Sequence, residues 1–351
     1  MNGHKQIQQV AQEIRHALGQ NRFVRATSAQ GFSIRRLLGV FAVVVLAVII
    51  LAVRGGGENQ KTVAAGIADP SHSLTESGLA SARIQFDDPL PTDRGLPDIH
   101  VTAALVKELG AQNSIFTYRP RARWPIASIT KLMTAMVAMD ELGPATIVDI
   151  SQEAADTEGD SGNLKAGEKY SVNDLIRAML VVSSNDAAVA LAQAYDSRQL
   201  GKDAYEKAIN KTALFTALMQ QRARSFGMPE TYFGDPSGLS MVNQSVVGDL
   251  AILVDRVLAL HPELFDTTRQ KSTTILERVK WSKRTLVNIN QFAGQKDFLG
   301  GKTGFTTEAG QNLITVFEYA GKKYLIIVLG TEDRFGETSK LYEWLKVQKL
   351  P

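Results

Sequence analysis

A serine and a lysine that are three residues apart could together perform nucleophilic chemistry. Ser128 and Lys131 lie in the stretch WPIASITKLMTAMVAMD, residues 124–140, which is otherwise almost wholly apolar. A serine hydroxyl is a weak nucleophile until a base removes its proton. The lysine amine can be that base only if its pKa falls well below about 10.4, which burial among apolar residues or a second nearby cation would cause.

The same two residues also have an ordinary structural explanation. Ser128 could cap the N-terminus of a helix, and Lys131 could lie on a solvated face with its stem over apolar neighbours. A serine three residues before a lysine is expected about once by chance in a chain of this length. The pair therefore indicates chemistry only if other residues support it.

Two motifs downstream could supply those residues. In VVSSNDAA, Ser183 and Asn185 lie at the junction of two apolar helical segments, and in LGGKTGFTTEAG, Lys302, Thr303 and Gly304 enter a strand. Alone, the first is usually a turn or a helix cap and the second a strand approach. The order Ser-x-x-Lys, Ser-x-Asn, Lys-Thr-Gly is a far stronger signal, and Lys302 could be the second cation if its strand comes close.

In these motifs the sequence resembles the serine D-alanyl-D-alanine carboxypeptidases, the low-molecular-mass penicillin-binding proteins. The resemblance covers roughly residues 98–346 and includes AGEKYSVNDLIRAMLVVSSNDAAVALA, FGDPSGLS and DRFGETSKL. It implies a β-lactamase/transpeptidase-like fold and a peptidase that acts on peptidoglycan stem peptides ending in D-Ala-D-Ala. It also implies inhibition by β-lactams and a reaction that needs no metal and no organic cofactor.

The resemblance implies three catalytic residues and one that orients the substrate. Ser128 would be the nucleophile, Lys131 its base, and Ser183 the group that relays a proton to the leaving amine. Asn185 would hold the peptide backbone of the substrate. The Asp235 carboxylate in FGDPSGLS is expected to stabilise a turn.

The remaining implied residues bind the substrate. Lys302 and Thr303 would bind its terminal carboxylate, and Gly304 would let the peptide add to the strand edge. The backbone N–H of Phe305, with that of the nucleophile, would form the oxyanion hole. Arg334 matches a position associated with carboxylate recognition, although it could equally be a solvated loop arginine.

The elements that must position these residues alternate between strands and helices. Ranges with strand character surround ranges with helical periodicity, which predicts an α/β protein with an antiparallel sheet made from both termini and an inserted helical region. The expected strands are 101–110, 114–120, 146–151, 272–282, 284–290, 312–319 and 323–330. The expected helices are 128–142, 172–184, 185–195, 203–226, 246–260 and 337–347.

Composition excludes several kinds of chemistry. The 351 residues contain no cysteine, which excludes disulfides, zinc-thiolate sites and a cysteine nucleophile. None of the five histidines lies in a metal-binding cluster. Residues 1–54 carry a charge of +6, which leaves −3 for residues 55–351, so the basic character gives no argument for a nucleic-acid surface.

An apolar segment near the N-terminus predicts attachment to a membrane. Residues 37–53 hold no charge and are flanked by Arg35, Arg36 and Arg54. A buried core helix and a cleaved signal peptide are the alternatives to an uncleaved signal anchor. The predicted organisation is a cytoplasmic segment 1–36, a single transmembrane helix 37–53, a flexible linker 54–97 and a catalytic domain 98–351 on the outer side of the bacterial cell membrane.

Three functions compete for this sequence. The first is a D,D-carboxypeptidase, which could also cut D,D-crosslinks as an endopeptidase. The second is a β-lactamase, although the Glu-containing run linked to deacylation in class A enzymes is not evident. The third is a β-lactam-binding membrane sensor with little turnover, which the intact motifs disfavour.

Overall fold

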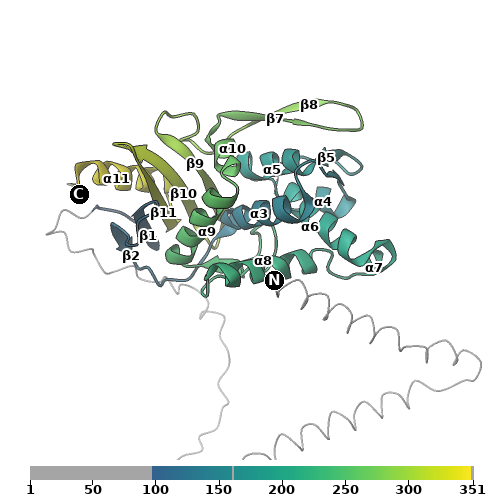
Figure 1. Ribbon diagram of the computed structural model, residues 1–351, viewed down its shortest axis with the longest axis horizontal. Coiled ribbons are helices and arrows are strands. Elements are labelled where there is room, and N and C mark those ends of the chain that lie inside the picture. The colour runs from purple at the N-terminus through teal and green to yellow at the C-terminus, as the bar shows by residue number, and fades with distance from the viewer. Residues whose placement is uncertain (1–96, 160–161, 349–351) are drawn as a thin grey trace, which may run out of the picture. The chain divides into compact units, whose positions relative to one another are not determined.

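The computed structural model describes residues 97–159 and 162–348. Within them a five-stranded sheet lies at one end and helices make up the other (Figure 1). The predicted cytoplasmic segment, the membrane-spanning segment 37–53 and nearly all of the linker lie outside the described residues. In the part of the chain that is described, none of the helices is both long and apolar enough to span a bilayer.

The sheet is antiparallel and combines both ends of the described chain, as the sequence predicts. Its spatial order is β2-β1-β11-β10-β9, so the first strand pairs with the last one. The strand that carries the Lys-Thr-Gly motif, β9, lies at the edge of the sheet. The strands are β1 Ala103–Glu108, β2 Phe116–Tyr118, β9 Phe298–Thr306, β10 Gly310–Tyr319 and β11 Lys322–Thr331.

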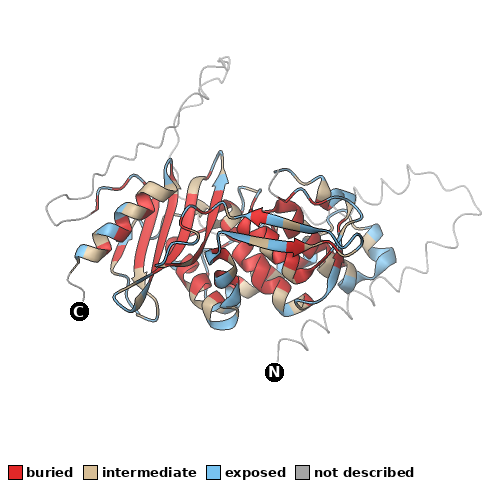
Figure 2. Ribbon diagram, turned by 90° about the horizontal axis from the view of Figure 1, so that it is seen from above, coloured by how far each residue is buried: buried red, intermediate tan, exposed pale blue. Residues whose placement is uncertain are grey.

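Both faces of the sheet are covered, which explains the unbroken apolar runs in β10 and β11. Alternate residues of a strand point to opposite faces. In β11, Leu325 and Ile327 pack with the helical core, whereas Tyr324 and Ile326 pack with buried residues of α11 (Arg334–Val347). The strands are accordingly buried over most of their length (Figure 2). Edge strand β9 is therefore held by a packed, two-sided layer.

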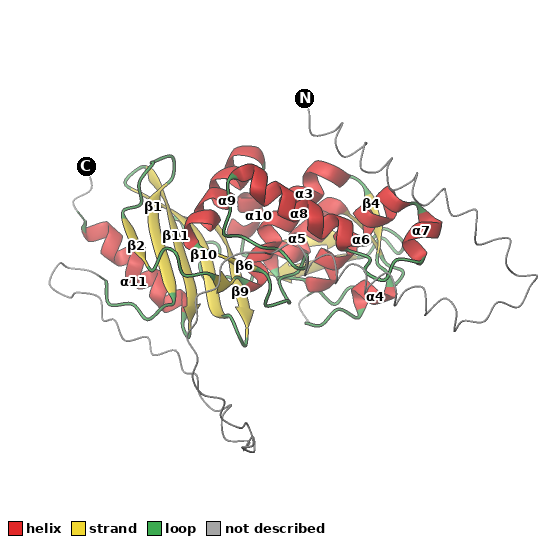
Figure 3. Ribbon diagram, turned by 90° about the horizontal axis from the view of Figure 1, so that it is seen from below, coloured by secondary structure: helices red, strands yellow, loops and turns green. Residues whose placement is uncertain are grey.

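Helix α3 lies at the centre of the helical part and contacts α5, α6, α8 and α9. Every residue from 131 to 138 of this helix is buried, as expected for an almost wholly apolar segment, and its methionines pack in the core or, for Met139, against it. Figure 3 shows the helices that surround it. The helices are α3 Lys131–Leu142, α4 Gln152–Ala155, α5 Val172–Val181, α6 Asn185–Leu200, α7 Lys202–Glu206, α8 Ala213–Phe226, α9 Val247–Leu260, α10 Glu263–Arg269 and α11 Arg334–Val347, with a 3-10 turn η3 at Ala127–Thr130.

Three small two-stranded sheets complete the described fold. The pair β7–β8 is a hairpin that leads from α10 towards β9. The strands are β3 Trp124–Pro125 with β6 Gln244–Ser245, β4 Ile147–Asp149 with β5 Lys169–Ser171, and β7 Ser272–Leu276 with β8 Lys283–Val287.

Some predicted boundaries are wrong for identifiable reasons. The helix expected over 203–226 is two helices, α7 and α8, because the Asp196 carboxylate accepts hydrogen bonds from the backbone N–H groups of Leu214 and Phe215 and starts α8 there. Helix α5 ends before Ser183, whose positive φ of 63° breaks the helical path. Helix α10 has no counterpart among the predicted elements because it is only seven residues long.

Candidate active site

The 3-10 turn η3 presents Ser128 immediately before α3. Ala127 has a left-handed φ of 48° at the start of this turn. Neither N-cap, Ile126 of η3 nor Thr130 of α3, makes a side-chain capping bond. Ser128 is therefore not the helix cap that the structural explanation required, and its hydroxyl is available for other contacts.

The Lys131 amine is completely buried and lies against the Ser128 hydroxyl. The distance from Lys131 Nζ to Ser128 Oγ is 2.8 Å, and Lys131 has no exposed surface. The alternative in which Lys131 lies on a solvated face is therefore wrong. The turn from Ser128 to Lys131 brings both groups together within one short segment of chain.

Burial lowers the pKa of Lys131 to about 7, against the opposing charges of Asp235 and Asp186. Its Nζ also contacts Asn185 Oδ1 at 2.6 Å and the Ser237 carbonyl oxygen at 2.5 Å. These two acceptors orient the amine towards Ser128. Because a neutral amine has a free lone pair, a substantial fraction of the protein at neutral pH can take a proton from the serine.

A second pair of serine and lysine faces the first. Lys302 Nζ, on β9, lies 2.9 Å from Ser183 Oγ and 2.8 Å from the Thr303 carbonyl oxygen. Burial lowers the pKa of Lys302 strongly, and the nearby charges of Lys131 and Arg334 lower it further. The sequence named burial and a second cation as the two causes that could lower the pKa of Lys131. Burial is the cause in the structure, and the repulsion between the two lysines lowers the pKa of Lys302 instead.

Ser183 is held in a backbone conformation that serine rarely adopts. Its φ of 63° lies in the left-handed region, which costs an ordinary residue on the order of 1–3 kcal/mol. The residue forms the junction between α5 and α6, where its hydroxyl accepts a hydrogen bond from Lys302. Such strain persists where the surrounding structure imposes it, and it is common at functional sites.

Asn185 is the first residue of α6, and hydrogen bonds at both the oxygen and the nitrogen of its side-chain amide fix the orientation of that amide. Its Oδ1 accepts from Lys131, and its Nδ2 donates to the Glu158 carbonyl oxygen at 2.7 Å. Gly159 makes this approach possible, since a Cβ at Gly159 would lie 2.6 Å from that nitrogen. The side chain that the sequence assigned to the substrate therefore also holds the buried amine.

Gly304 brings β9 close to the nucleophile turn. A Cβ at Gly304 would lie 2.7 Å from the carbonyl oxygen of Ile126, two residues before Ser128. Arg334, the first residue of α11, donates from Nη1 to the Gly304 carbonyl oxygen at 3.0 Å, and burial lowers its pKa. The solvated alternative for Arg334 is thus wrong, because its guanidinium lies half-buried against the motif.

Two predicted residues are less directly connected to the centre. Thr303 is buried opposite Leu313 of β10, and in the described part of the chain its side chain makes no hydrogen bond to the serines or lysines of the site. Phe305 follows on the same strand with an exposed side chain. The structure therefore places both on β9 without contact to the Ser128 hydroxyl.

The contact between Lys131 and the Ser237 carbonyl is a feature that sequence reasoning missed. The Asp235 carboxylate holds this turn, and hydrogen bonds from Ser237, Ser240 and Gly238 keep its pKa below the usual value although burial alone would raise it. It accepts from Ser237 N and Oγ, Gly238 N, Ser240 N and Asn243 Nδ2 at 2.6–2.8 Å. The motif FGDPSGLS signalled a turn, which is confirmed, but not what the turn contacts.

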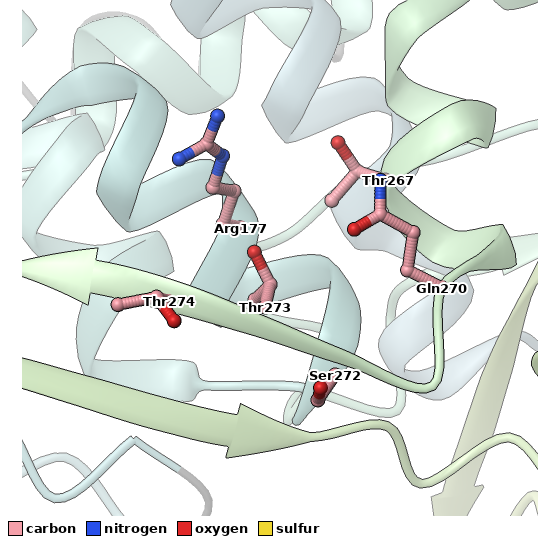
Figure 4. A pocket seen from close by; sticks show the side chains of 6 residues that line it. All are labelled: Arg177, Thr267, Gln270, Ser272, Thr273 and Thr274. Carbon is pink, nitrogen blue, oxygen red and sulfur yellow. The ribbon is translucent and has the colours of Figure 1, made fainter.

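A cavity lined only by polar residues lies apart from these catalytic side chains (Figure 4). It measures about 320 Å³ and is bounded by Arg177, Thr267, Gln270, Ser272, Thr273 and Thr274. None of the candidate catalytic residues lines it. Across residues 97–159 and 162–348, no group of three or more acidic or histidine side chains is arranged to hold a metal ion.

A buried amine of lowered pKa on a serine hydroxyl, beside a second serine–lysine pair, defines a serine hydrolase that uses lysine as its base. The family profile described as D-alanyl-D-alanine carboxypeptidase matches residues 91–333. The chain therefore belongs to the D-alanyl-D-alanine carboxypeptidase family, and it is a serine-type peptidase.

Similar proteins include both carboxypeptidases and endopeptidases. The chain is 30% identical to the D-alanyl-D-alanine endopeptidase of Escherichia coli over 74% of this chain and 81% of that protein. It is also 30% identical to the E. coli carboxypeptidase DacD, over 76% of this chain and 67% of that protein.

Solved structures show the same fold. Penicillin-binding protein D2 of Listeria monocytogenes, in its ampicillin-bound form, has a TM-score of 0.57 and 30% identity over 71% of this chain and 99% of that one. Penicillin-binding protein 6B of E. coli has a TM-score of 0.59 and 27% identity over 73% of this chain and 80% of that one. The predicted β-lactamase/transpeptidase-like arrangement of antiparallel sheet and helices is thereby confirmed.

Proposed function

We propose that this peptidase removes the terminal D-alanine from peptidoglycan stem peptides through an acyl-enzyme on Ser128. The observation that carries the proposal is the buried Lys131 amine, 2.8 Å from the Ser128 hydroxyl, with a pKa lowered to about 7.

In the first half-reaction, Ser128 Oγ attacks the carbonyl carbon of the D-Ala–D-Ala peptide bond while its proton passes to Lys131. The oxyanion is stabilised by the backbone N–H groups of Ser128 and Phe305, a contribution commonly worth about 3–4 kcal/mol per donor. Ser183 then delivers its proton to the leaving nitrogen and takes the proton held by Lys131, so that both the amine and the serine hydroxyl return to their neutral forms. The C–N bond breaks, and free D-alanine departs. The product is an ester between Ser128 and the shortened peptide.

In the second half-reaction, a water molecule attacks the ester carbonyl and gives a proton to Lys131. The C–O bond to Ser128 breaks, the serine recovers its proton, and the shortened stem peptide is released with a new carboxyl group. The same neutral amine thus acts as base in both halves, which is why its lowered pKa matters for turnover.

The substrate carboxylate binds between Lys302 and Arg334. Within the described residues both side chains have only neutral hydrogen-bond partners: Ser183 Oγ and the Thr303 carbonyl for Lys302, and the Gly304 carbonyl for Arg334. A bound carboxylate would favour the protonated form of Lys302, whose pKa burial lowers. The Nε of Arg334 is buried and has no partner among the described residues. An anion that joins these groups would relieve their mutual repulsion, while Thr303 and Asn185 orient the peptide and Gly304 admits it to the strand edge.

Cleavage of D,D-crosslinks is the second activity that we propose for the same site. It is supported by the endopeptidases of E. coli and Pseudomonas aeruginosa, of which the chain covers 81% and 83%. The chemistry is unchanged, because only the leaving amine differs. β-Lactams are the inhibitors expected to acylate Ser128, as the ampicillin-bound and cefotaxime-bound structures of the Listeria protein suggest.

Attachment to the bacterial cell membrane is part of the proposal and depends on sequence alone. Residues 37–53 would span the bilayer once, with residues 1–36 in the cytoplasm and the catalytic domain outside. Alkaline carbonate extraction of cells, with protease added to intact spheroplasts, tests it. Release of the chain by carbonate, or protection of the catalytic domain from protease, would contradict this arrangement.

The test of activity uses the full chain, a fluorescent penicillin, a pentapeptide ending in D-Ala-D-Ala, and a cross-linked peptide dimer. We expect covalent labelling on Ser128 and release of D-alanine, both absent in Ser128→Ala and both retained in Ser282→Ala, which removes an exposed serine. Rapid destruction of the penicillin would instead indicate a β-lactamase. Labelling without turnover of either peptide would indicate a sensor.

A further inference from the structure

The β7–β8 hairpin concentrates positive charge that the rest of the extramembrane chain lacks. Residues 269–284, named here the basic hairpin, contain six basic residues and one acid, a net charge of +5. Since residues 55–351 together carry −3, the remainder of that region carries −8. The hairpin runs along an outer edge of the described fold, above α5 (Figure 1).

The same hairpin and the residues just after it expose large apolar side chains. Val279 and Trp281 at the turn are 54% and 67% exposed, and Val287 and Ile289 at the end of β8 and beyond are 69% and 44% exposed. A tryptophan with both apolar and polar parts is favoured at the boundary between water and lipid. Cationic and apolar side chains therefore lie together on one solvent-facing element.

The turn of the hairpin is held by hydrogen bonds, and its one acidic side chain is buried. The buried Glu277 carboxylate accepts from the backbone N–H groups of Lys169, Val279 and Lys280 at 3.1, 2.8 and 2.5 Å. The backbone N–H of Arg278 also donates to the Lys169 carbonyl at 2.8 Å. The turn is thus tied to β5, and its exposed residues are preorganised, which lowers the entropic cost of binding.

Two basic residues near the turn have partners within the fold, and two others are exposed to solvent. Arg278 pairs with Asp174, and Arg284 donates to Tyr170 Oη and the Asn163 carbonyl. Lys280 and Lys283 are exposed on either side of Trp281, and neither amine lies within 4 Å of a carboxylate in the described residues, although the charge of Lys280 also acts on Glu277. These two lysines are available to an external anion.

We propose that the basic hairpin docks on the surface of an anionic phospholipid bilayer, with Trp281 and Val279 at the level of the headgroups and Lys280 and Lys283 on the lipid phosphates. A soluble polyanion would attract the lysines but would not cover the exposed apolar side chains, whereas a bilayer interface accepts both. The proposal is independent of the peptidase activity, because neither lysine contacts the catalytic centre.

The absence of cysteine allows a direct test on the full chain. Val279→Cys, labelled with a polarity-sensitive fluorophore, reports on the hairpin, and Ile209→Cys, at a fully exposed position, is the label control. The protein is reconstituted with vesicles of phosphatidylcholine alone or mixed with phosphatidylglycerol. We expect a blue shift at position 279 only with phosphatidylglycerol, reversed by high salt, and none at position 209.

Charge variants measure the strength of docking. Each cation near an anionic surface contributes about a fivefold factor, so K280Q with K283Q should lower the ratio of docked to free hairpin about 25-fold. K202Q with K207Q, which removes two exposed lysines from the segment of α7, should not change it. Labelling of each variant by fluorescent penicillin verifies that it is folded.

Three results would overturn the proposal. The label could show no shift with phosphatidylglycerol vesicles, or an equal shift with phosphatidylcholine alone. It could also shift with soluble poly(glycerol phosphate) and not with vesicles, which would assign the hairpin to an anionic wall polymer.

Discussion

The pH dependence of Ser128 acylation tests the central chemistry directly. If only the neutral Lys131 amine accepts the serine proton, the acylation rate follows the fraction of that amine that is unprotonated. Burial lowers the pKa of Lys131 to about 7, so the rate should rise with pH through about 7 and then level off. The sign follows from the charge: raising the pH removes the proton that blocks the base.

The size of the increase in acylation rate distinguishes a buried amine with a lowered pKa from a solvated amine with the usual pKa. With a pKa of about 7, the neutral fraction grows about tenfold between pH 6 and pH 8 and hardly at all above pH 9. An amine with the usual pKa of about 10.4 would give a rise of about 100-fold over the same interval and no plateau before pH 10.

The assay is the second-order rate of covalent labelling by a fluorescent penicillin, followed by quenched-flow sampling from pH 5 to pH 10. Lys131→Arg is the informative variant, because arginine stays protonated throughout this range and should abolish labelling at every pH. A rate that continues to climb beyond pH 9, or that is flat from pH 5 upward, would refute the assignment of Lys131 as the base.

Further variants test how the site is held in place. Gly238→Ala should abolish labelling and lower the unfolding temperature, because its Cβ would lie 2.0 Å from the Ala127 carbonyl oxygen. The control Gly143→Ala has a similar positive φ but open space, so it should cost about 1–3 kcal/mol of backbone strain and retain labelling. Asp235→Asn should reduce the free energy of unfolding in urea by about 1–3 kcal/mol for each of the two donors left unpaired, Ser240 N and Asn243 Nδ2. It should also move the pH midpoint of acylation below 7, because the lost negative charge had favoured protonated Lys131. Arg334→Ala should lower kcat/KM for the pentapeptide about 10- to 100-fold, which matches one lost charged hydrogen bond. Unchanged labelling of Gly238→Ala would contradict the close approach of Gly238 to Ala127. An unmoved pH midpoint in Asp235→Asn would contradict the interaction of Asp235 with Lys131, and an unchanged kcat/KM in Arg334→Ala would contradict the role of Arg334 in carboxylate binding.

The sequence predicted the sheet and most of the helices because their signals are local. Unbroken apolar runs bounded by turn residues mark β10 and β11, and helical periodicity marks α5 and α9. The errors fall where a distant residue decides the boundary, as when Asp196 on α6 starts α8. A pattern within one segment cannot contain a capping group that another segment supplies.

The chemical groups of the site, and their order along the chain, follow from the sequence by itself. Ser128 and Lys131 share one turn, so their contact is a local property of the chain. The tertiary structure decided that the amine is neutral and aligned, because its burial and its two other acceptors, Asn185 and Ser237, come from segments 54 and 106 residues away. Desolvation is a property of everything packed around a group, which is why only the assembled fold sets the pKa of Lys131.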